Sequence, residues 1–138
     1  MTQPPKIYTQ AQANQFVPRL KSLIPELRTI RCGIIQEKDQ CDVEEVTSFG
    51  SAGKLAELAR EKMDQHQANV RRYEREFEKK LKVFDEIGCD LKSIEPGLVD
   101  FYSESKGQLI YLCWKEDEPE ISYWHTLTGG FTGRQKLP

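Results

Sequence analysis

The residues best suited to chemistry are gathered in the last third of the chain. Two strand-like runs, residues 108–114 and 120–125, contain both tryptophans, and a glycine-rich tail at residues 129–134 ends in an arginine. His125 is the side chain here that can transfer protons near neutral pH. Together with Arg134 it could bind a carboxylate or phosphate. This pattern predicts a polar–aromatic pocket for a small anionic ligand.

A structural role is the competing interpretation of the tail. Gly129 and Gly130 would form a turn, Phe131 would anchor the tail to the core, and Arg134 would pair with a surface acid. The glycines could also present backbone N–H groups to an anion. However, the tail lacks the strand–loop–helix context and the lysine of a P-loop. Both interpretations stay open at this point.

A metal site is a third possibility, because thiol, imidazole and carboxylate groups are all zinc or iron ligands. If the loop between the runs spans residues 115–119, Cys113 pairs with Ile121 and His125 pairs with Leu109. Cys113 and His125 would then share a face but lie roughly 13 Å apart, at about 3.4 Å per residue. One ion could not bridge that distance. Only a site of His125 with carboxylates from elsewhere in the chain would survive this argument. The leading interpretation therefore has no metal ligands, with Cys113 as a small buried hydrophobic residue.

The elements that position these residues begin with a helix near the N-terminus. Thr9 and Gln12 have the spacing of a capping box, so a helix should begin near Gln10. Apolar residues then continue at helical spacing. Pro18 and Pro25 interrupt this pattern, which predicts either a short helix before Pro18 or a long helix kinked at one of the prolines.

A second and longer helix is expected next. The acidic and small residues at 39–50 predict a connecting loop, after which apolar residues recur every three or four positions from about Gly53 to Ile87. Gly88 is placed to end this helix. The two helices should pack antiparallel. Because the second is longer, part of its apolar stripe needs another cover, either the C-terminal strands or a second copy of the chain.

β-Structure is expected after Gly88. Pro96 and Gly97 mark a turn, residues 98–101 are a candidate strand, and the two aromatic runs form a hairpin. The predicted fold class is α+β, with a long antiparallel helical hairpin packed with a small C-terminal antiparallel β-sheet. The 138 residues fit a single domain, with the helical hairpin at 9–87 and the β-hairpin and glycine-rich tail at 88–138.

The composition excludes several classes of protein. The net charge of −2 lacks the basic surplus of a nucleic-acid binder. No stretch approaches the roughly 20 apolar residues that span a membrane, and the N-terminus lacks the apolar run of a signal peptide. None of the four cysteines forms a C-x-x-C pair. We therefore expect a cytoplasmic protein with free thiols and with neither nucleic acid nor membrane as partner.

Several long strings of this sequence resemble a bacterial family catalogued as domain of unknown function 2203. The strings are residues 9–20, 96–101, 111–114, 118–125 and 130–135, and the similarity covers nearly all of the chain. The resemblance implies a small cytosolic prokaryotic protein and supplies no catalytic residues. It also implies one shared feature made of Asp100, Trp114, Glu118, Trp124, His125, Gly133 and Arg134. Thr126 stands where the family often has Asp, which argues against an acid at that position assisting His125.

The sequence leaves three classes of function. The leading one is a non-catalytic module that binds a protein partner or a small anionic ligand, with a pocket of Asp100, Trp124, His125 and Arg134. Its long helix would form a homodimer or partner surface. The alternatives are a small enzyme that uses His125 as general acid or base with Glu118 or Asp100, and a carboxylate–histidine metal protein. The sequence names no cofactor and no substrate, and it does not decide whether the protein is an enzyme.

Overall fold

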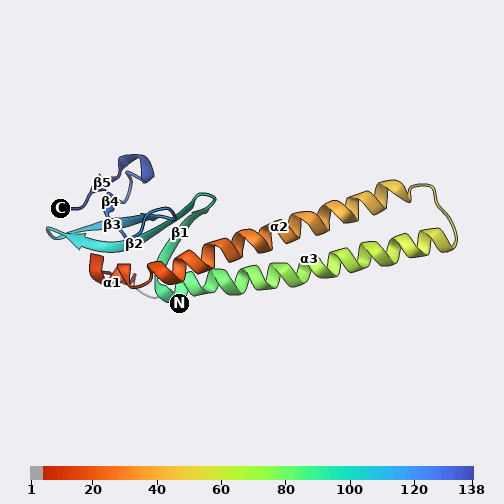
Figure 1. The fold of residues 1–138 in the computed structure, drawn as a ribbon, viewed down its shortest axis with the longest axis horizontal. Coiled ribbons are helices and arrows are strands. Elements are labelled where there is room, and N and C mark those ends of the chain that lie inside the picture. Colours follow the sequence, from red (N-terminus) through yellow and green to blue (C-terminus); the bar gives the residue numbers. More distant parts are fainter. Residues whose placement is uncertain (1–4) are drawn as a thin grey trace. The chain divides into compact units, whose positions relative to one another are not determined.

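The computed structural model describes residues 5–138, which form helices followed by a β-sheet (Figure 1). This confirms the α+β prediction of a helical hairpin with a C-terminal antiparallel sheet. The chain folds as two compact units. The first consists of the chain up to Glu26 together with Leu81–Pro138, and the second is Leu27–Lys80. The prediction of one domain, with parts at 9–87 and 88–138, stays a prediction.

Helix α1 (Gln10–Asn14) begins at the predicted capping box. The Thr9 hydroxyl accepts from the Gln12 backbone N–H at 3.2 Å, and the Gln12 side chain accepts from the Thr9 N–H at 2.9 Å. These two bonds satisfy donors that the start of a helix leaves unpaired. The helix ends before Pro18, so of the two predicted alternatives the short helix is the one observed.

Helices α2 (Val17–Thr47) and α3 (Lys54–Ile87) are the long elements of the chain. The prediction of a loop at 39–50 is wrong in its extent, because residues 39–47 continue α2. Acidic side chains are solvated on a helix surface as readily as in a loop, and Glu44 lies 3.7 Å from Lys62 of α3. Composition alone could not separate the two cases.

The second unit is an antiparallel helical hairpin, whose two helices lie side by side in Figure 1. Glu37 of α2 contacts His66 of α3 at 2.6 Å. Gly33 faces Tyr73 so closely that an added Cβ would lie 3.2 Å from the ring. With 31 residues in α2 and 34 in α3, the second helix is only slightly longer. The end of α3 from Leu81 on belongs to the unit that contains the strands, where Phe84 and Ile87 are buried, and a cover by a second copy of the chain stays a prediction.

The sheet contains five antiparallel strands in chain order. They are β1 (Cys89–Ile94), β2 (Gly97–Ser105), β3 (Gln108–Lys115), β4 (Tyr123–His125) and β5 (Gln135–Lys136). Gly88 ends α3 with a φ of 86°, the left-handed conformation that glycine adopts without strain, as predicted. Strand β1 was not predicted. Among the described residues no helix has the length and apolar character that a membrane crossing requires.

The two faces of the sheet have different chemistry. One face forms the core of the first unit, where the centroid of the Phe101 ring lies 5.5 Å from that of Tyr8 and 6.3 Å from that of Phe16. Its other buried residues include Val99, Leu112 and Trp114. The opposite face carries polar side chains that are nevertheless buried. Since successive residues of a strand point to opposite sides, the strand alternation places the polar set on one surface.

Candidate functional site

The pairing of β3 with β4 decides which side chains meet on the polar face. Tyr111 pairs with His125, and Cys113 pairs with Tyr123. The predicted pairing of His125 with Leu109 is therefore wrong by two residues. An even shift leaves every side chain on its predicted face. It reduces the offset between Cys113 and His125 from four residues to two.

The register shifts because residues 120–122 do not join the strand. The Ile121 backbone is held by two side chains of α1: its N–H donates to Asn14 Oδ1 at 2.6 Å, and its carbonyl accepts from Gln10 Nε2 at 2.8 Å. The Ile121 side chain is fully buried. A buried backbone needs its hydrogen-bond partners from some source, and here α1 supplies them in place of β3.

Asp100, Cys113 and His125 form a buried cluster on three neighbouring strands. Asp100 of β2 pairs directly with Cys113 of β3, and His125 of β4 is diagonally adjacent. The three residues are 4%, 2% and 2% exposed. One ligand-type atom from each lies within 4.8 Å of the other two. The prediction that Cys113 and His125 lie too far apart to share an ion is wrong.

The hydrogen bonds of His125 fix the roles of its ring nitrogens. Nδ1 lies 2.7 Å from the carbonyl oxygen of Thr126. A carbonyl can only accept, so Nδ1 carries a proton and donates it. Nε2 then faces Asp100 Oδ2 at 3.1 Å. The acid beside His125 is thus Asp100, and residue 126 contributes through its backbone.

The cluster contains polar groups that the described protein atoms leave incompletely satisfied. Asp100 Oδ1 is buried and has no hydrogen-bond partner among them. Such an atom costs on the order of 1–3 kcal/mol unless something else pairs with it. Burial, followed by the negative charge of Asp100, raises the pKa of Cys113 to about 12. The thiol therefore stays protonated at neutral pH unless a cation replaces its proton.

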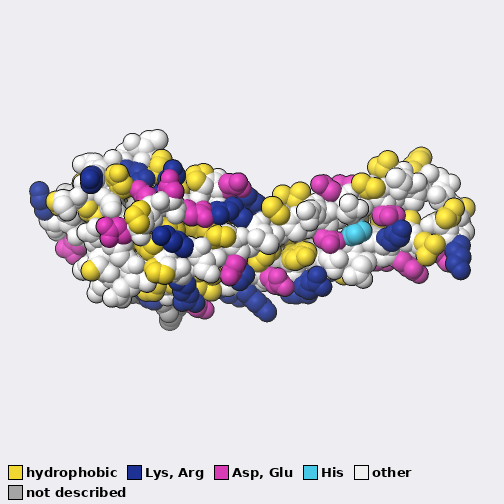
Figure 2. Space-filling view, in the orientation of Figure 1, with side chains coloured by type: hydrophobic (Ala, Val, Ile, Leu, Met, Phe, Trp, Pro, Cys, Tyr) yellow, Lys and Arg dark blue, Asp and Glu magenta, His cyan; other side chains and the backbone are white. Residues whose placement is uncertain are grey.

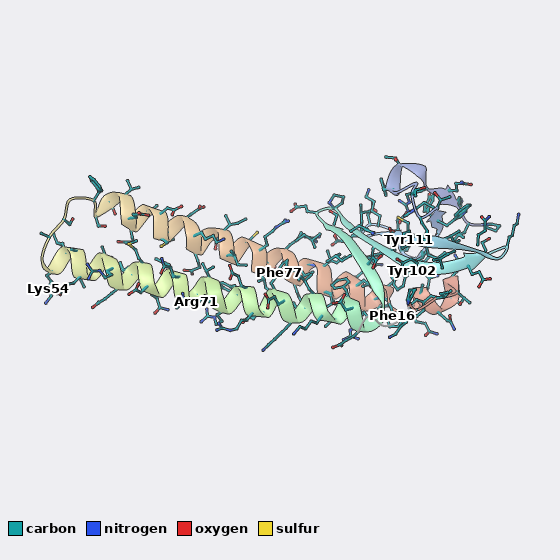
Figure 3. The ribbon with its side chains drawn as sticks, turned by 180° about the vertical axis from the view of Figure 1, so that it is seen from behind. Phe16, Lys54, Arg71, Phe77, Tyr102 and Tyr111 are labelled. Carbon is teal, nitrogen blue, oxygen red and sulfur yellow. The ribbon has the colours of Figure 1, made fainter. Side chains whose placement is uncertain are left out.

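A cavity of about 310 Å³ opens onto this cluster. Its lining residues are Lys92, Leu98, Asp100, Tyr111, Cys113, His125, Leu127, Thr128, Gly130 and Phe131. The Tyr111 hydroxyl donates to Asp90 at 3.1 Å and lies 3.0 Å from the Tyr102 hydroxyl, and Figure 3 shows the two tyrosines side by side on the sheet. Burial is the main cause that raises the pKa of Tyr111. Its ring lies 5.3 Å from that of His125.

Glu118 and Arg134 form a separate clamp. Arg134 Nη2 lies 2.7 Å from both carboxylate oxygens of Glu118, and the guanidinium stacks 4.0 Å from the Tyr123 ring centroid. The same nitrogen donates to the Cys113 carbonyl at 3.4 Å. Arg134 therefore pairs with an acid of the chain, as in the structural interpretation, but the Glu118 side chain is only 17% exposed and is not the surface acid that was expected. Phe131 is exposed, so the prediction that it anchors the tail to the core is wrong.

The structure places the predicted site residues in three groups. Asp100 and His125 meet in the cluster, and Glu118 and Arg134 meet in the clamp. Trp114 and Trp124 belong to the opposite face, since they pair across strands with Val99 and Leu112. Trp124 lines another cavity, of about 510 Å³.

Gly133 ends a short 3-10 helix (η1, Phe131–Gly133) just before the clamp. Sequence reasoning missed Cys113, Tyr111 and Lys92 as parts of the site. The signal for Cys113 was present, because strand alternation already put it on the face of His125.

The chain was compared with known proteins. It matches the family model described as uncharacterized conserved protein (DUF2203) over residues 6–137. No curated protein and no solved structure gave a significant match. The match spans nearly the whole chain and confirms the resemblance predicted from its motifs. The chain therefore belongs to the DUF2203 family of uncharacterized conserved proteins.

Proposed function

We propose that this protein binds a divalent transition metal, with Zn²⁺ the best match, on Asp100, Cys113 and His125. Carboxylate, thiolate and imidazole are the three ligand types that zinc uses in proteins. With zinc–ligand bonds of about 2.0–2.3 Å, tetrahedral ligand atoms lie roughly 3.3–3.8 Å from one another. The three side-chain atoms already lie within 4.8 Å of each other. Small side-chain rotations would close them around an ion.

One observation carries the proposal: the arrangement of acceptor atoms between His125 and Asp100. His125 Nδ1 is committed to the Thr126 carbonyl, so a neutral imidazole presents its Nε2 lone pair to Asp100 Oδ2, 3.1 Å away. Two acceptors at that distance need a shared cation, either a proton or a metal ion. A proton would bridge only these two groups, although the Cys113 sulfur lies within 4.8 Å of a ligand-type atom of each. A metal also engages the carboxylate and replaces the Cys113 proton.

The other predicted functions receive less support from this geometry. An enzyme that uses His125 as general acid or base would rely on Asp100, because Glu118 is engaged by Arg134. Anion binding at Arg134 would have to displace Glu118, both of whose carboxylate oxygens lie 2.7 Å from Arg134 Nη2. Both stay predictions. A cytoplasmic location remains part of the proposal, since Cys113 must stay reduced to bind a metal.

The test is metal analysis of protein purified without a His-tag, followed by zinc titration against a chromophoric chelator. We expect about one zinc per chain, and binding about 100-fold weaker or worse in Cys113→Ala and His125→Gln, because losing even an outer-shell partner of a ligand costs about 10–100-fold. Cys89→Ala is the matched control for the thiol. Cys89 is also buried, but it faces the core and contacts the Phe84 carbonyl.

His66→Gln is the corresponding control for the imidazole, because His66 pairs with Glu37 in the helical hairpin. Equal zinc affinity in all four variants and the wild type, or no stoichiometric zinc in the wild type, would overturn the proposal.

Self-association through the helical hairpin is a second proposal, retained from the predicted homodimer. Its support is a group of exposed apolar side chains around the loop end, where Figure 2 shows hydrophobic side chains gathered. The group consists of Val43, Val46, Phe49, Leu55 and Leu58, with Phe49 91% exposed. A two-fold interface brings the same patch of each subunit together. An apolar patch is complementary to its own copy, whereas a patch of one charge would repel it.

A further inference from the structure

We infer that the cavity beside the cluster takes a small organic acid, whose donor atom binds the metal and whose carboxylate contacts Lys92. This inference rests on the proposed metal site and adds the class of ligand. Three protein ligands leave a fourth position open on a tetrahedral zinc ion, as in catalytic zinc sites. Asp100, Cys113 and His125 all line the cavity, so the open position faces it.

The size of the cavity limits the ligand. About 310 Å³ is near the lower end of the range for small-molecule pockets. Leu98, Leu127 and Phe131 give it apolar walls, and the Tyr111 ring adds an aromatic surface. A ligand of this size with a short apolar body fits such walls better than a fully polar one, because apolar contacts replace water on both sides.

The charges indicate where an anionic group would lie. A divalent metal bound by one thiolate and one carboxylate has no net charge. The metal centre therefore attracts a distant anion only weakly by electrostatics. Lys92 is the only lysine or arginine among the residues that line the cavity. Its ammonium lies 5.3 Å from the centroid of the Tyr111 ring, which is itself 5.3 Å from the His125 ring. A molecule that crosses the face of Tyr111 therefore reaches from the metal to Lys92.

The backbone around Lys92 is adapted to present this side chain. The register of β1 against β2 shifts between Leu91 and Ser93, which leaves Lys92 as the extra residue of a β-bulge. Bulges commonly redirect a side chain next to a binding site. The Lys92 side chain is 47% exposed, and its nitrogen lies 3.7 Å from Asp90. That distance exceeds a hydrogen bond, so a ligand carboxylate can compete for the ammonium.

The test uses full-length protein loaded with Co²⁺, whose visible bands report ligands on the metal. The probes are 4-imidazolepropionate and its uncharged match 4-propylimidazole, titrated at pH 8. We expect both to shift the bands, with the acid binding about tenfold more tightly, as a charge-assisted hydrogen bond provides. In Lys92→Met the preference should fall to about twofold or less. Lys115→Met is the control, since Lys115 pairs with Asp117 and lies outside the lining.

Each other outcome has a distinct meaning. Equal affinity for the two probes in the wild type, or a preference that survives Lys92→Met, would overturn the assignment of Lys92. Bands that neither probe shifts would show that the metal has no position open to the cavity, which also overturns the inference. The absence of Co²⁺ bands before any probe is added would instead remove the metal site on which the inference depends.

Discussion

Removal of the Arg134 guanidinium should destabilise the folded protein measurably. Glu118 and Arg134 are 17% and 12% exposed, and Arg134 Nη2 lies 2.7 Å from both carboxylate oxygens. Removing one partner of a fully buried pair costs about 3–5 kcal/mol, whereas an exposed pair contributes about 0–1 kcal/mol. For this mostly buried pair we expect Arg134→Met to lose about 2–3 kcal/mol, between those limits.

A double-mutant cycle isolates the pair from its surroundings. Glu118→Gln keeps an oxygen for the Lys115 N–H, which donates to Glu118 Oε1 at 2.7 Å. It should therefore cost only about 1 kcal/mol, the typical value for one hydrogen bond. The coupling energy should be about 1–2 kcal/mol, in the range found for residues in direct contact. Urea unfolding followed by tryptophan fluorescence measures all three variants, with an unchanged slope as evidence that the comparison is valid.

The refuting result is equally specific. If Arg134→Met changes the free energy of unfolding by less than about 0.5 kcal/mol, as an ordinary surface substitution does, the clamp is not structural. Lys115→Met supplies that surface reference, because it removes only the Lys115–Asp117 contact at 3.4 Å. Without a structural role, Arg134 would again be a candidate for anion binding.

Three further predictions follow from the cluster, the core and the helical hairpin. Zinc at about 100 times its dissociation constant should stabilise the wild type by about 2.7 kcal/mol and Cys113→Ala hardly at all, measured by urea unfolding; equal gains would contradict the site. Burial raises the pKa of Cys89 to about 12 from an ordinary value near 9. Between about pH 9 and 12 the thiol therefore ionises only in unfolded chains, so the free energy of unfolding should fall as the pH rises through this range. Cys89→Ala should show a shallower fall, and an identical pH profile would refute this. Sedimentation at micromolar concentration should give a dimer that Phe49→Ser weakens, whereas a clean wild-type monomer excludes the homodimer.

Local signals in the sequence were enough to predict the two helix ends that carry them, the start of α1 and the end of α3. The capping box at Thr9 and the glycine at Gly88 act through neighbouring backbone groups, and both are observed. The end of α2 has no such signal. Its last residues are acidic and are compatible with either loop or helix, so the prediction stopped several residues short of Thr47.

The candidate site depended on information that a local pattern does not contain. The alternation of β3 correctly placed Cys113 and His125 on one face, but their separation required the register. That register depends on Asn14 and Gln10, which hold the backbone of Ile121 from more than a hundred residues away in the chain. The hydrophobic pattern within residues 108–125 contains no information about these hydrogen bonds to the N-terminal helix. The cluster therefore became visible only with the tertiary structure.

The discontinuity of the first unit also has a consequence for the order in which the protein can form. Asn14 and Gln10 are synthesised first, but their partner Ile121 emerges only after the helical hairpin is complete. The unit must therefore close around a loop that contains all of Leu27–Lys80. The entropy cost of such closure rises by only about 0.6 kcal/mol for each doubling of the length of a flexible loop. A folded helical hairpin costs less still, because its two antiparallel helices already bring the two ends of the segment together. Matched turns could thus be added to or removed from α2 and α3 at little cost to the cluster, so the hairpin can vary in length independently of the site.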